Sequence, residues 1–302
     1  MTQPILVPLD GSELAEQALD LAVAVATRTA APIHLVRMPL WPPNSPLAAR
    51  DDVTSYLDAA AERVSAQVDA KVETAILPEK AQDGDSWPAS AGSIADHVLE
   101  YGRKRGAAMV VLATHGRGGL ARAWFGSVAD ALIRRADLPV LVVRPEEGEP
   151  SDRAIRHVLV PLDPSDASRS VLEPATSLAR AFDARITLLR IIPWPYQVND
   201  TFLPATVVSV GEDLATVRAN AAQELEGVAA SLRTQGLEVE VAVMEHVAPG
   251  RAIADYAKDE GADLVALATH SRSGFDRLVL GSVADKVVRG AECPVLLVRS
   301  GD

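Results

Sequence analysis

Short apolar runs alternate with longer segments of helical periodicity along most of the chain. The run at residues 109–113 is short and rich in valine, which is typical of a strand buried on both faces of a parallel sheet. The segment that begins at Ser12 instead repeats apolar residues every three or four positions, which favours an amphipathic helix. Strands separated by helices imply parallel pairing with right-handed crossovers, so the pattern predicts an α/β fold.

The same criteria assign elements to both halves of the chain. In the first half we expect strands at 5–9, 33–38, 72–77, 109–113 and 139–143, and helices from Ser12, at 51–68, at 93–105 and from Ser127. In the second half we expect strands at 158–162, 185–192, 237–244, 263–268 and 294–298, and helices at 167–181, 212–234 and 250–260. Pro174 predicts a kink in the helix at 167–181, because proline removes one backbone hydrogen bond.

The chain contains two copies of one stretch. Residues 110–144 and 264–299 share the sequences Ala-Thr-His and Gly-Ser-Val-Ala-Asp, and Thr114 lies 155 residues before Thr269. A long loop that is kept twice with the same polar residues indicates an internal repeat. We therefore predict two domains, at residues 1–145 and 155–302, joined by a charged, proline-bearing linker at 146–154.

Each copy has a glycine-rich loop that opens a helix. In the first copy the loop contains Gly116, Gly118 and Gly119 and ends at Gly126-Ser127. We expect Ser127 to cap the helix and the loop amides to point inward, where Arg117 and Arg122 add positive charge. Unpaired N–H groups at the positive end of a helix dipole favour a phosphate ligand.

Composition narrows the class of protein. A chain of 302 residues with 48% hydrophobic and 23% charged residues is globular and long enough for two cores. The net charge of −12 argues against a nucleic-acid partner, because binding phosphates along a strand needs a basic face. We recognise no signal-peptide pattern at Met1 and no apolar run long enough to cross a membrane. Cys293 is the single cysteine, which fits the reducing cytoplasm and a small buried hydrophobic role.

The two repeated stretches, taken with Val7-Pro8-Leu9-Asp10 and Val160-Pro161-Leu162-Asp163, resemble the universal stress proteins in their tandem two-domain form. That family carries an ATP-binding pattern of glycine, two residues, glycine, nine residues, then Gly-Ser or Gly-Thr. The resemblance implies two Rossmann-like domains, each a five-stranded parallel sheet of order 3-2-1-4-5 with helices on both faces. Ligands of such sheets bind outside the carboxyl ends of the strands where the order reverses, here between the first and fourth strands.

The resemblance also implies the nucleotide-binding residues. In the first copy they are Pro8, Asp10, Met38, Ala113, His115, Gly116, Gly119, Gly126, Ser127 and Val128. In the second copy they are Asp163, Ile191, Ala268, His270, Ser271, Gly281, Ser282 and Val283. The aspartates would accept hydrogen bonds from a ribose hydroxyl or an adenine edge, although each could instead only cap the following turn. The backbones of Met38 and Ile191 would meet adenine, and the histidines would orient the loop or face phosphate instead of acting as bases.

Two departures from the family pattern bear on affinity. Ala113 and Ala268 replace the first glycine of the pattern and add a methyl group close to the nucleotide. Ser271 replaces the second glycine in the second copy. If that position needs a left-handed backbone, serine costs about 1–2 kcal/mol and weakens binding roughly tenfold. We therefore expect the first site to be the stronger one.

Three functions follow from these observations. The first is a stress-response regulatory protein that binds ATP, alone or with Mg²⁺, and thereby changes the surface it offers to an unidentified protein partner. The second is an interaction module that has lost nucleotide binding in one or both halves. The third is a slow ATPase or autophosphorylating protein. No phosphate-loop lysine or nucleophile elbow accompanies Ser127 or Ser282, so we assign no catalytic residue and no protein-only metal site. In the family the apolar last strands pair between domains, and we expect the same pairing here together with a homodimer.

Overall fold

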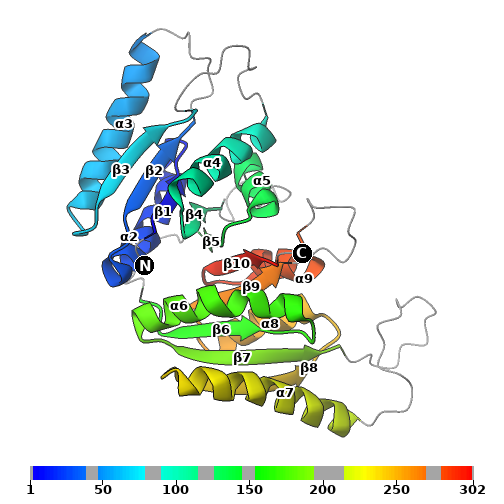
Figure 1. Cartoon of the computed structure of the whole chain (residues 1–302). Coiled ribbons are helices and arrows are strands. Elements are labelled where there is room, and N and C mark those ends of the chain that lie inside the picture. Colours follow the sequence, from blue (N-terminus) through cyan, green and yellow to red (C-terminus); the bar gives the residue numbers. More distant parts are fainter. Residues whose placement is uncertain are drawn as a thin grey trace. The chain divides into compact units, whose positions relative to one another are not determined.

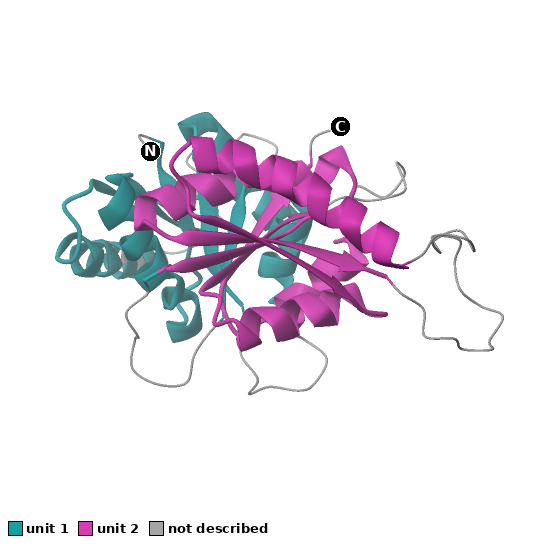
Figure 2. Cartoon of the chain, turned by 90° about the horizontal axis from the view of Figure 1, so that it is seen from below, with its two compact units in different colours: residues 1–154, 273–279 teal, residues 155–272, 280–302 magenta. Residues whose placement is uncertain are grey.

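A computed structural model of the chain describes residues 3–38, 47–78, 90–114, 126–144, 154–193, 214–269 and 280–300. The described residues divide into two compact units (Figure 2). Unit 1 runs to Ala154, and unit 2 begins at Ile155. Each unit is described below by itself.

Unit 1 alternates strands and helices as the hydrophobic pattern predicts (Figure 1). Its elements are β1 (Ile5–Pro8), α1 (Glu13–Glu16), α2 (Ala18–Thr29), β2 (Ile33–Arg37), α3 (Leu47–Ser65), β3 (Val72–Ile76), α4 (Ala91–Arg105), β4 (Met109–Ala113), α5 (Ser127–Arg135) and β5 (Val140–Val143). The strands lie in the order β3-β2-β1-β4-β5 and pair in parallel. Central strand β1 is buried, with Ile5 and Val7 at 0% exposure, so its apolar run is explained by burial on both faces.

Unit 2 repeats this arrangement. Its elements are β6 (His157–Pro161), the 3₁₀ helix η1 (Asp166–Val171), α6 (Leu172–Phe182), β7 (Arg185–Ile192), α7 (Leu214–Thr234), β8 (Val239–Glu245), α8 (Pro249–Asp259), β9 (Leu264–Thr269), α9 (Ser282–Gly290) and β10 (Val295–Arg299). The strand order is β8-β7-β6-β9-β10, again in parallel, with helices on both faces of the sheet (Figure 2). The predicted α/β fold and the order 3-2-1-4-5 are confirmed in both units.

Some helix boundaries differ from the predicted ones. The segment at 166–182 is a 3₁₀ turn followed by α6, and Pro174 is the third residue of α6. Proline is tolerated in the first turn of an α-helix, where most N–H groups have no intrahelical acceptor. The predicted kink at Pro174 stays a prediction. Helix α4 begins at Ala91, two residues before the predicted start at Ser93, and is capped by Ser90. Ser93 lies in the first turn, and the two serines form a reciprocal capping box.

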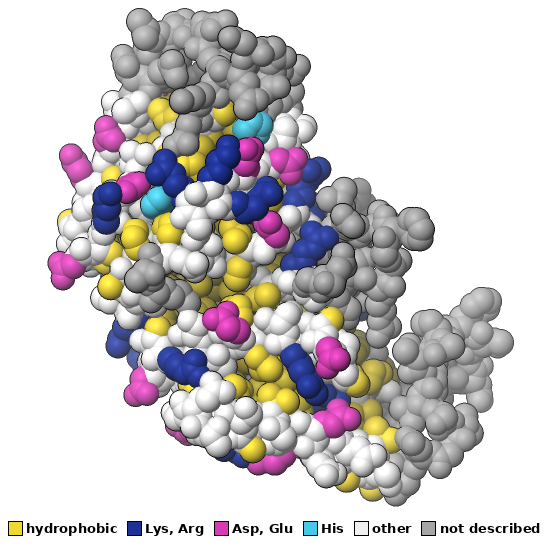
Figure 3. All heavy atoms as spheres, viewed as in Figure 1, with side chains coloured by type: hydrophobic (Ala, Val, Ile, Leu, Met, Phe, Trp, Pro, Cys, Tyr) yellow, Lys and Arg dark blue, Asp and Glu magenta, His cyan; other side chains and the backbone are white. Residues whose placement is uncertain are grey.

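One face of the described residues is mixed in charge (Figure 3). On the face shown in Figure 3, Lys and Arg side chains are interspersed with Asp and Glu instead of forming one basic stripe. Within the described ranges, no helix combines the length and the apolar character needed to cross a bilayer.

Candidate functional site

The carboxyl ends of neighbouring strands bring several predicted site residues to one edge of unit 1. Pro8 ends β1 and Ala113 ends β4, and these strands pair with Ile5 opposite Met109. Met38 directly follows β2, which pairs with the other side of β1. In parallel sheets this edge, where the strand order reverses, is the ordinary place for a ligand.

A tight turn orients the predicted aspartate after β1. Asp10 Oδ1 accepts hydrogen bonds from the Ser12 amide at 2.9 Å and the Ser12 hydroxyl at 2.6 Å. Ser12 Oγ in turn accepts from the Ala15 amide at 3.1 Å and caps α1. Asp10 therefore caps the turn that follows β1, and this turn leaves its carboxylate exposed at the edge of the sheet.

Unit 2 repeats the turn with the same residue types. Asp163 Oδ1 accepts from the Ser165 amide at 2.8 Å and from the Ser165 hydroxyl. Ser165 Oγ accepts from the Ser168 amide at 3.2 Å and caps η1. The neighbouring predicted residues also lie at or near the ends of strands, with Ile191 in β7 and Ala268 in β9.

Helix α5 begins with glycine at its N-cap and Ser127 as its first helical residue. The Asp130 amide donates the first backbone bond of the helix, to the Gly126 carbonyl, at 2.9 Å. The prediction that Ser127 caps α5 is therefore wrong. Because Gly126 has no side chain to cap the helix, the amides of the first turn are left to another acceptor. These first-turn amides lie at the positive end of the helix dipole.

Helix α9 starts in the same way. Gly281 is the N-cap, and the Asp285 amide donates to its carbonyl at 2.9 Å, so Ser282, like Ser127, is the first helical residue and not the cap. Ser127 and Ser282 are both exposed. The next residues differ, since Val128 is half-buried while Val283 is 36% exposed.

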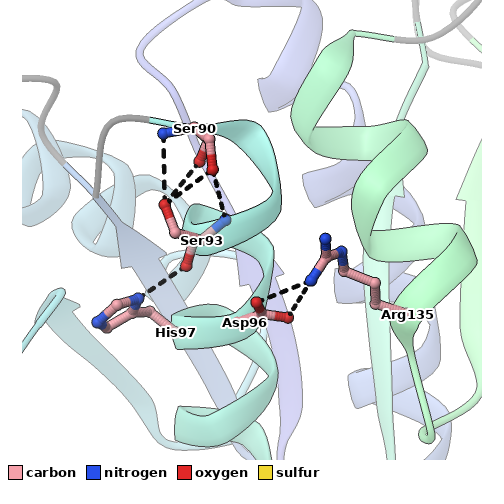
Figure 4. A network of polar contacts seen from close by, with 5 residues as sticks. All are labelled: Ser90, Ser93, Asp96, His97 and Arg135. Atoms are coloured by element: carbon pink, nitrogen blue, oxygen red, sulfur yellow. Dashed lines mark hydrogen bonds and ion pairs between the residues drawn. The ribbon is translucent and has the colours of Figure 1, made fainter. Parts of the chain in front are cut away.

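The last turn of α5 is fixed to α4 by an ion pair (Figure 4). Arg135 Nη1 lies 3.0 Å from Asp96 Oδ1 and 2.8 Å from Oδ2. In α4 itself, His97 Nδ1 contacts the Ser93 carbonyl at 2.7 Å, next to the capping box. The helix whose start is a candidate phosphate site thus has its far end anchored to its neighbour.

A cationic side chain that the motif analysis missed lies beside the Asp10 turn. The Arg37 guanidinium stacks over the Tyr56 ring at 4.7 Å from the centroid. A β-carbon on Gly11 would lie 2.8 Å from Arg37 Nη2, the flexible end of that side chain. Glycine is favoured at position 11 because its φ is +90°. Burial, together with the carboxylate of Glu16, raises the pKa of Tyr56 well above its ordinary value.

Unit 2 has an arginine at the same place with different partners. Arg190 is 7% exposed, and its Nε donates to the Leu162 carbonyl at 2.5 Å. Its Nη1 lies 3.2 Å from Glu224 Oε2. Arg37 and Arg190 are 153 residues apart, the same separation as Asp10 and Asp163, and this repeat was the signal in the sequence that could have found them.

Five predicted site residues lie outside the described residues. They are His115, Gly116, Gly119, His270 and Ser271. The roles assigned to them remain predictions. The site residues that the structure describes come from strand ends and from the starts of α5 and α9.

Comparison with known proteins assigns the family. The model of the universal stress protein family matches residues 1–144 and again residues 154–299. The chain belongs to the universal stress protein family. The resemblance to its tandem two-domain form is thereby confirmed.

Relatives and solved structures support the family assignment and the fold. Universal stress protein Rv2005c of Mycobacterium tuberculosis strain H37Rv is 32% identical over 194 residues, which are 64% of this chain and 62% of that protein. The alignment thus spans less than two thirds of that relative. Universal stress protein MJ0531 of Methanocaldococcus jannaschii is 30% identical over 145 residues, covering 48% of this chain and 82% of that protein. A universal stress protein structure from Archaeoglobus fulgidus DSM 4304 has a TM-score of 0.72 with full coverage of both chains and 16% identity, which shows the shared fold.

Proposed function

We propose that this universal stress protein binds an adenine nucleotide, with ATP as the expected ligand, at the carboxyl edge of the sheet of unit 1. Binding would change the surface that the protein offers to a partner. The observation that carries the proposal is the start of α5, where Gly126 leaves the first-turn amides without a side-chain cap. Asp10, held by its turn at the end of β1, supplies an acceptor suited to the ribose or the adenine.

Each described residue has a distinct part in this proposal. The amides of Ser127 and Val128 would bind phosphate oxygens, favoured by the helix dipole. The absent side chain at Gly126 allows close approach. Among the described residues, no group of three or more His, Cys, Asp or Glu side chains is arranged to hold a metal ion. We propose that Mg²⁺ enters on the nucleotide phosphates, as it commonly does at nucleotide sites.

Unit 2 is proposed as a second, weaker site. Its helix α9 begins with the same Gly-Ser pair, and Asp163 has the same turn as Asp10. The expected loss is about tenfold if Ser271 must take a left-handed backbone. We extend the proposal to a homodimer in the cytoplasm, which sedimentation of the purified protein and fractionation of its host cells would test.

Calorimetric titration of Mg²⁺–ATP into the full chain tests the two sites separately. Gly126→Asp is the informative variant, because aspartate is a favoured N-cap that stabilises the helix while its charge repels phosphate. We expect one strong binding event per chain that is lost in Gly126→Asp and kept in Gly281→Asp. A second event, about tenfold weaker, should be lost only in Gly281→Asp.

Other outcomes would redirect the proposal. Two events of equal affinity would contradict the argument from Ser271. No heat at any ATP concentration from folded protein would support the interaction module without nucleotide. Phosphate release from ATP-loaded protein at a rate above that of the Gly126→Asp, Gly281→Asp double variant would favour the slow ATPase.

A further inference from the structure

We propose that Arg190 is a positioning residue of the second nucleotide site and that Glu224 is its anchor. The inference rests on the proposed function and adds a determinant of ligand selectivity to it. Arg190 acts through the backbone that precedes Asp163 and does not itself touch the nucleotide.

The contacts of Arg190 join three elements beneath the turn. Arg190 lies in β7, donates to the carbonyl of Leu162 after β6, and pairs with Glu224 in α7. Its side chain is 9% exposed, whereas that of Glu224 is 54% exposed. A hydrogen bond from a guanidinium to a buried carbonyl is charge-assisted and short, so it fixes the peptide that leads directly into Asp163.

Unit 1 has the same fold without this arrangement, so the fold does not require it. Tyr56 directly precedes the buried Leu57 in α3, just as Glu224 directly precedes the buried Leu225 in α7. The buried positions four residues earlier, Val53 and Ala221, and seven residues later, Val64 and Leu232, keep the same register, and one buried alanine lies between in each helix. The two arginines therefore face equivalent helix positions, but Arg37 meets an aromatic ring where Arg190 meets a carboxylate.

The loops above the two arginines differ in a matching way. Position 11 is a glycine with φ +90°, against which the Arg37 guanidinium packs. The equivalent residue of unit 2 is Pro164, whose ring fixes φ near −65°. With a proline on one side of Asp163 and a bonded carbonyl on the other, the carboxylate is held in one orientation. Recognition of the ribose or the adenine edge by Asp163 should then depend on Arg190.

Selectivity among nucleotides separates positioning from simple stability. The full chain with Gly126→Asp leaves the second site for titration with ATP, 2′-deoxy-ATP, GTP and inorganic tripolyphosphate. Arg190→Lys keeps the charge but lacks the planar fork that reaches Leu162 and Glu224 together. We expect ATP affinity to fall about tenfold, while tripolyphosphate affinity stays within about twofold. The preference for ATP over 2′-deoxy-ATP or over GTP should shrink correspondingly.

Two matched variants complete the experiment. In the Gly281→Asp chain, Arg37→Lys should change ATP affinity by less than about twofold, because Arg37 has no hydrogen bond of this kind to the turn. Glu224→Gln in the Gly126→Asp chain keeps a hydrogen-bond acceptor for Arg190 and should give an intermediate loss. Thermal melts verify that each variant is folded.

The results can overturn the inference in three ways. Unchanged nucleotide selectivity in Arg190→Lys would refute it. Equal losses of ATP and tripolyphosphate binding together with a lowered melting temperature would assign Arg190 a structural role only. If the Gly126→Asp chain binds no nucleotide at millimolar concentration, the second site does not exist and the inference fails. The proposed function of unit 1 is judged separately, on the unaltered chain.

Discussion

Beneath the loop that follows the first strand of each sheet, the two units reach one turn geometry through different contacts. In both, an aspartate accepts hydrogen bonds from the amide and hydroxyl of the serine two residues later. Arg37 supports the turn of unit 1 by stacking on Tyr56, whereas Arg190 supports that of unit 2 by a buried hydrogen bond and an ion pair. The repeat keeps the aspartate, the serine and the arginine behind them, and it changes the partners of the arginine.

The helix pairs that carry the proposed phosphate sites differ in a similar manner. In unit 1, Arg135 joins α5 to α4 through Asp96, and a β-carbon at Gly92 would meet only the flexible end of that arginine, at 2.7 Å. In unit 2, a β-carbon at Gly250 would lie 2.7 Å from Cβ of Lys286 and 3.0 Å from the Val283 carbonyl. One pair is joined by a charge contact, the other by close packing of backbone.

The largest effect is expected from Gly250→Ala. The new methyl group would collide with backbone and with a β-carbon, neither of which can rotate away, so α8 and α9 must separate. We expect a loss of about 3 kcal/mol in the free energy of unfolding, at the upper end of overpacking effects. Because Val283 is in the first turn of α9, nucleotide affinity at the second site should fall as well. Urea denaturation followed by calorimetry measures both.

Two glycine variants serve as controls for this packing argument. Gly227→Ala lies in α7 with nothing within 4 Å of the new carbon, and should stabilise by about 0.5–1 kcal/mol through helix propensity. Gly92→Ala should cost little, since Arg135 can swing aside. Equal losses at Gly92 and Gly250 would contradict the distinction between the two helix pairs.

A smaller effect is expected when each arginine is replaced by methionine. Arg190→Met leaves the buried Leu162 carbonyl without its donor and should cost about 2 kcal/mol. Arg37→Met removes a cation–π contact and should cost less than about 1 kcal/mol. The difference between the two denaturation midpoints checks the claim that only unit 2 uses a buried hydrogen bond here. Midpoints that shift alike would refute it.

Acidification should lower the stability of both units. His34 and His157 are buried, and burial lowers the pKa of each below the ordinary 6.5. Below about pH 6.5 the unfolded chain binds protons that the folded chain does not. The free energy of unfolding is therefore unaffected well above this pH and falls as the pH drops below it. Denaturation midpoints at about pH 7.5 and about pH 5.5 should differ less in His34→Gln and in His157→Gln. Unchanged pH dependence in both variants would assign acid sensitivity to other groups.

The fold was predictable because its signals are local and repeated. Buried strands such as β4 appear as short valine-rich runs, and the repeat of Gly-Ser-Val-Ala-Asp fixed the correspondence between the units. Helix boundaries were less predictable where several residues compete to cap. The sequence predicts a start at Ser93 for one helix and a cap at Ser127 for another, but Ser90 and Gly126 are the N-caps in the structure.

The support of the site could not be deduced from the motif alone. The sequence pattern places Arg190 in a strand and its partner Glu224, 34 residues away, in a helix. It does not indicate which side of that helix faces the strand. Their contact follows from β7 and α7 packing together, which is tertiary information. The two loops that carry Gly116 and Ser271 lie outside the described residues, so the predicted asymmetry of affinity rests on the sequence.

The smallest effect is expected at the ion pair of unit 1. Asp96 and Arg135 are 56% and 33% exposed, and pairs with this exposure contribute about 0.2–1 kcal/mol. Asp96→Asn should therefore lower the free energy of unfolding by less than about 1 kcal/mol, with a smaller change in high salt. A double-mutant cycle with Arg135→Gln isolates the pair from other contacts of either residue. If the coupling were as large as the loss in Gly250→Ala, both helix pairs would be held equally firmly, and the contrast between a charge contact in unit 1 and close packing in unit 2 would not hold.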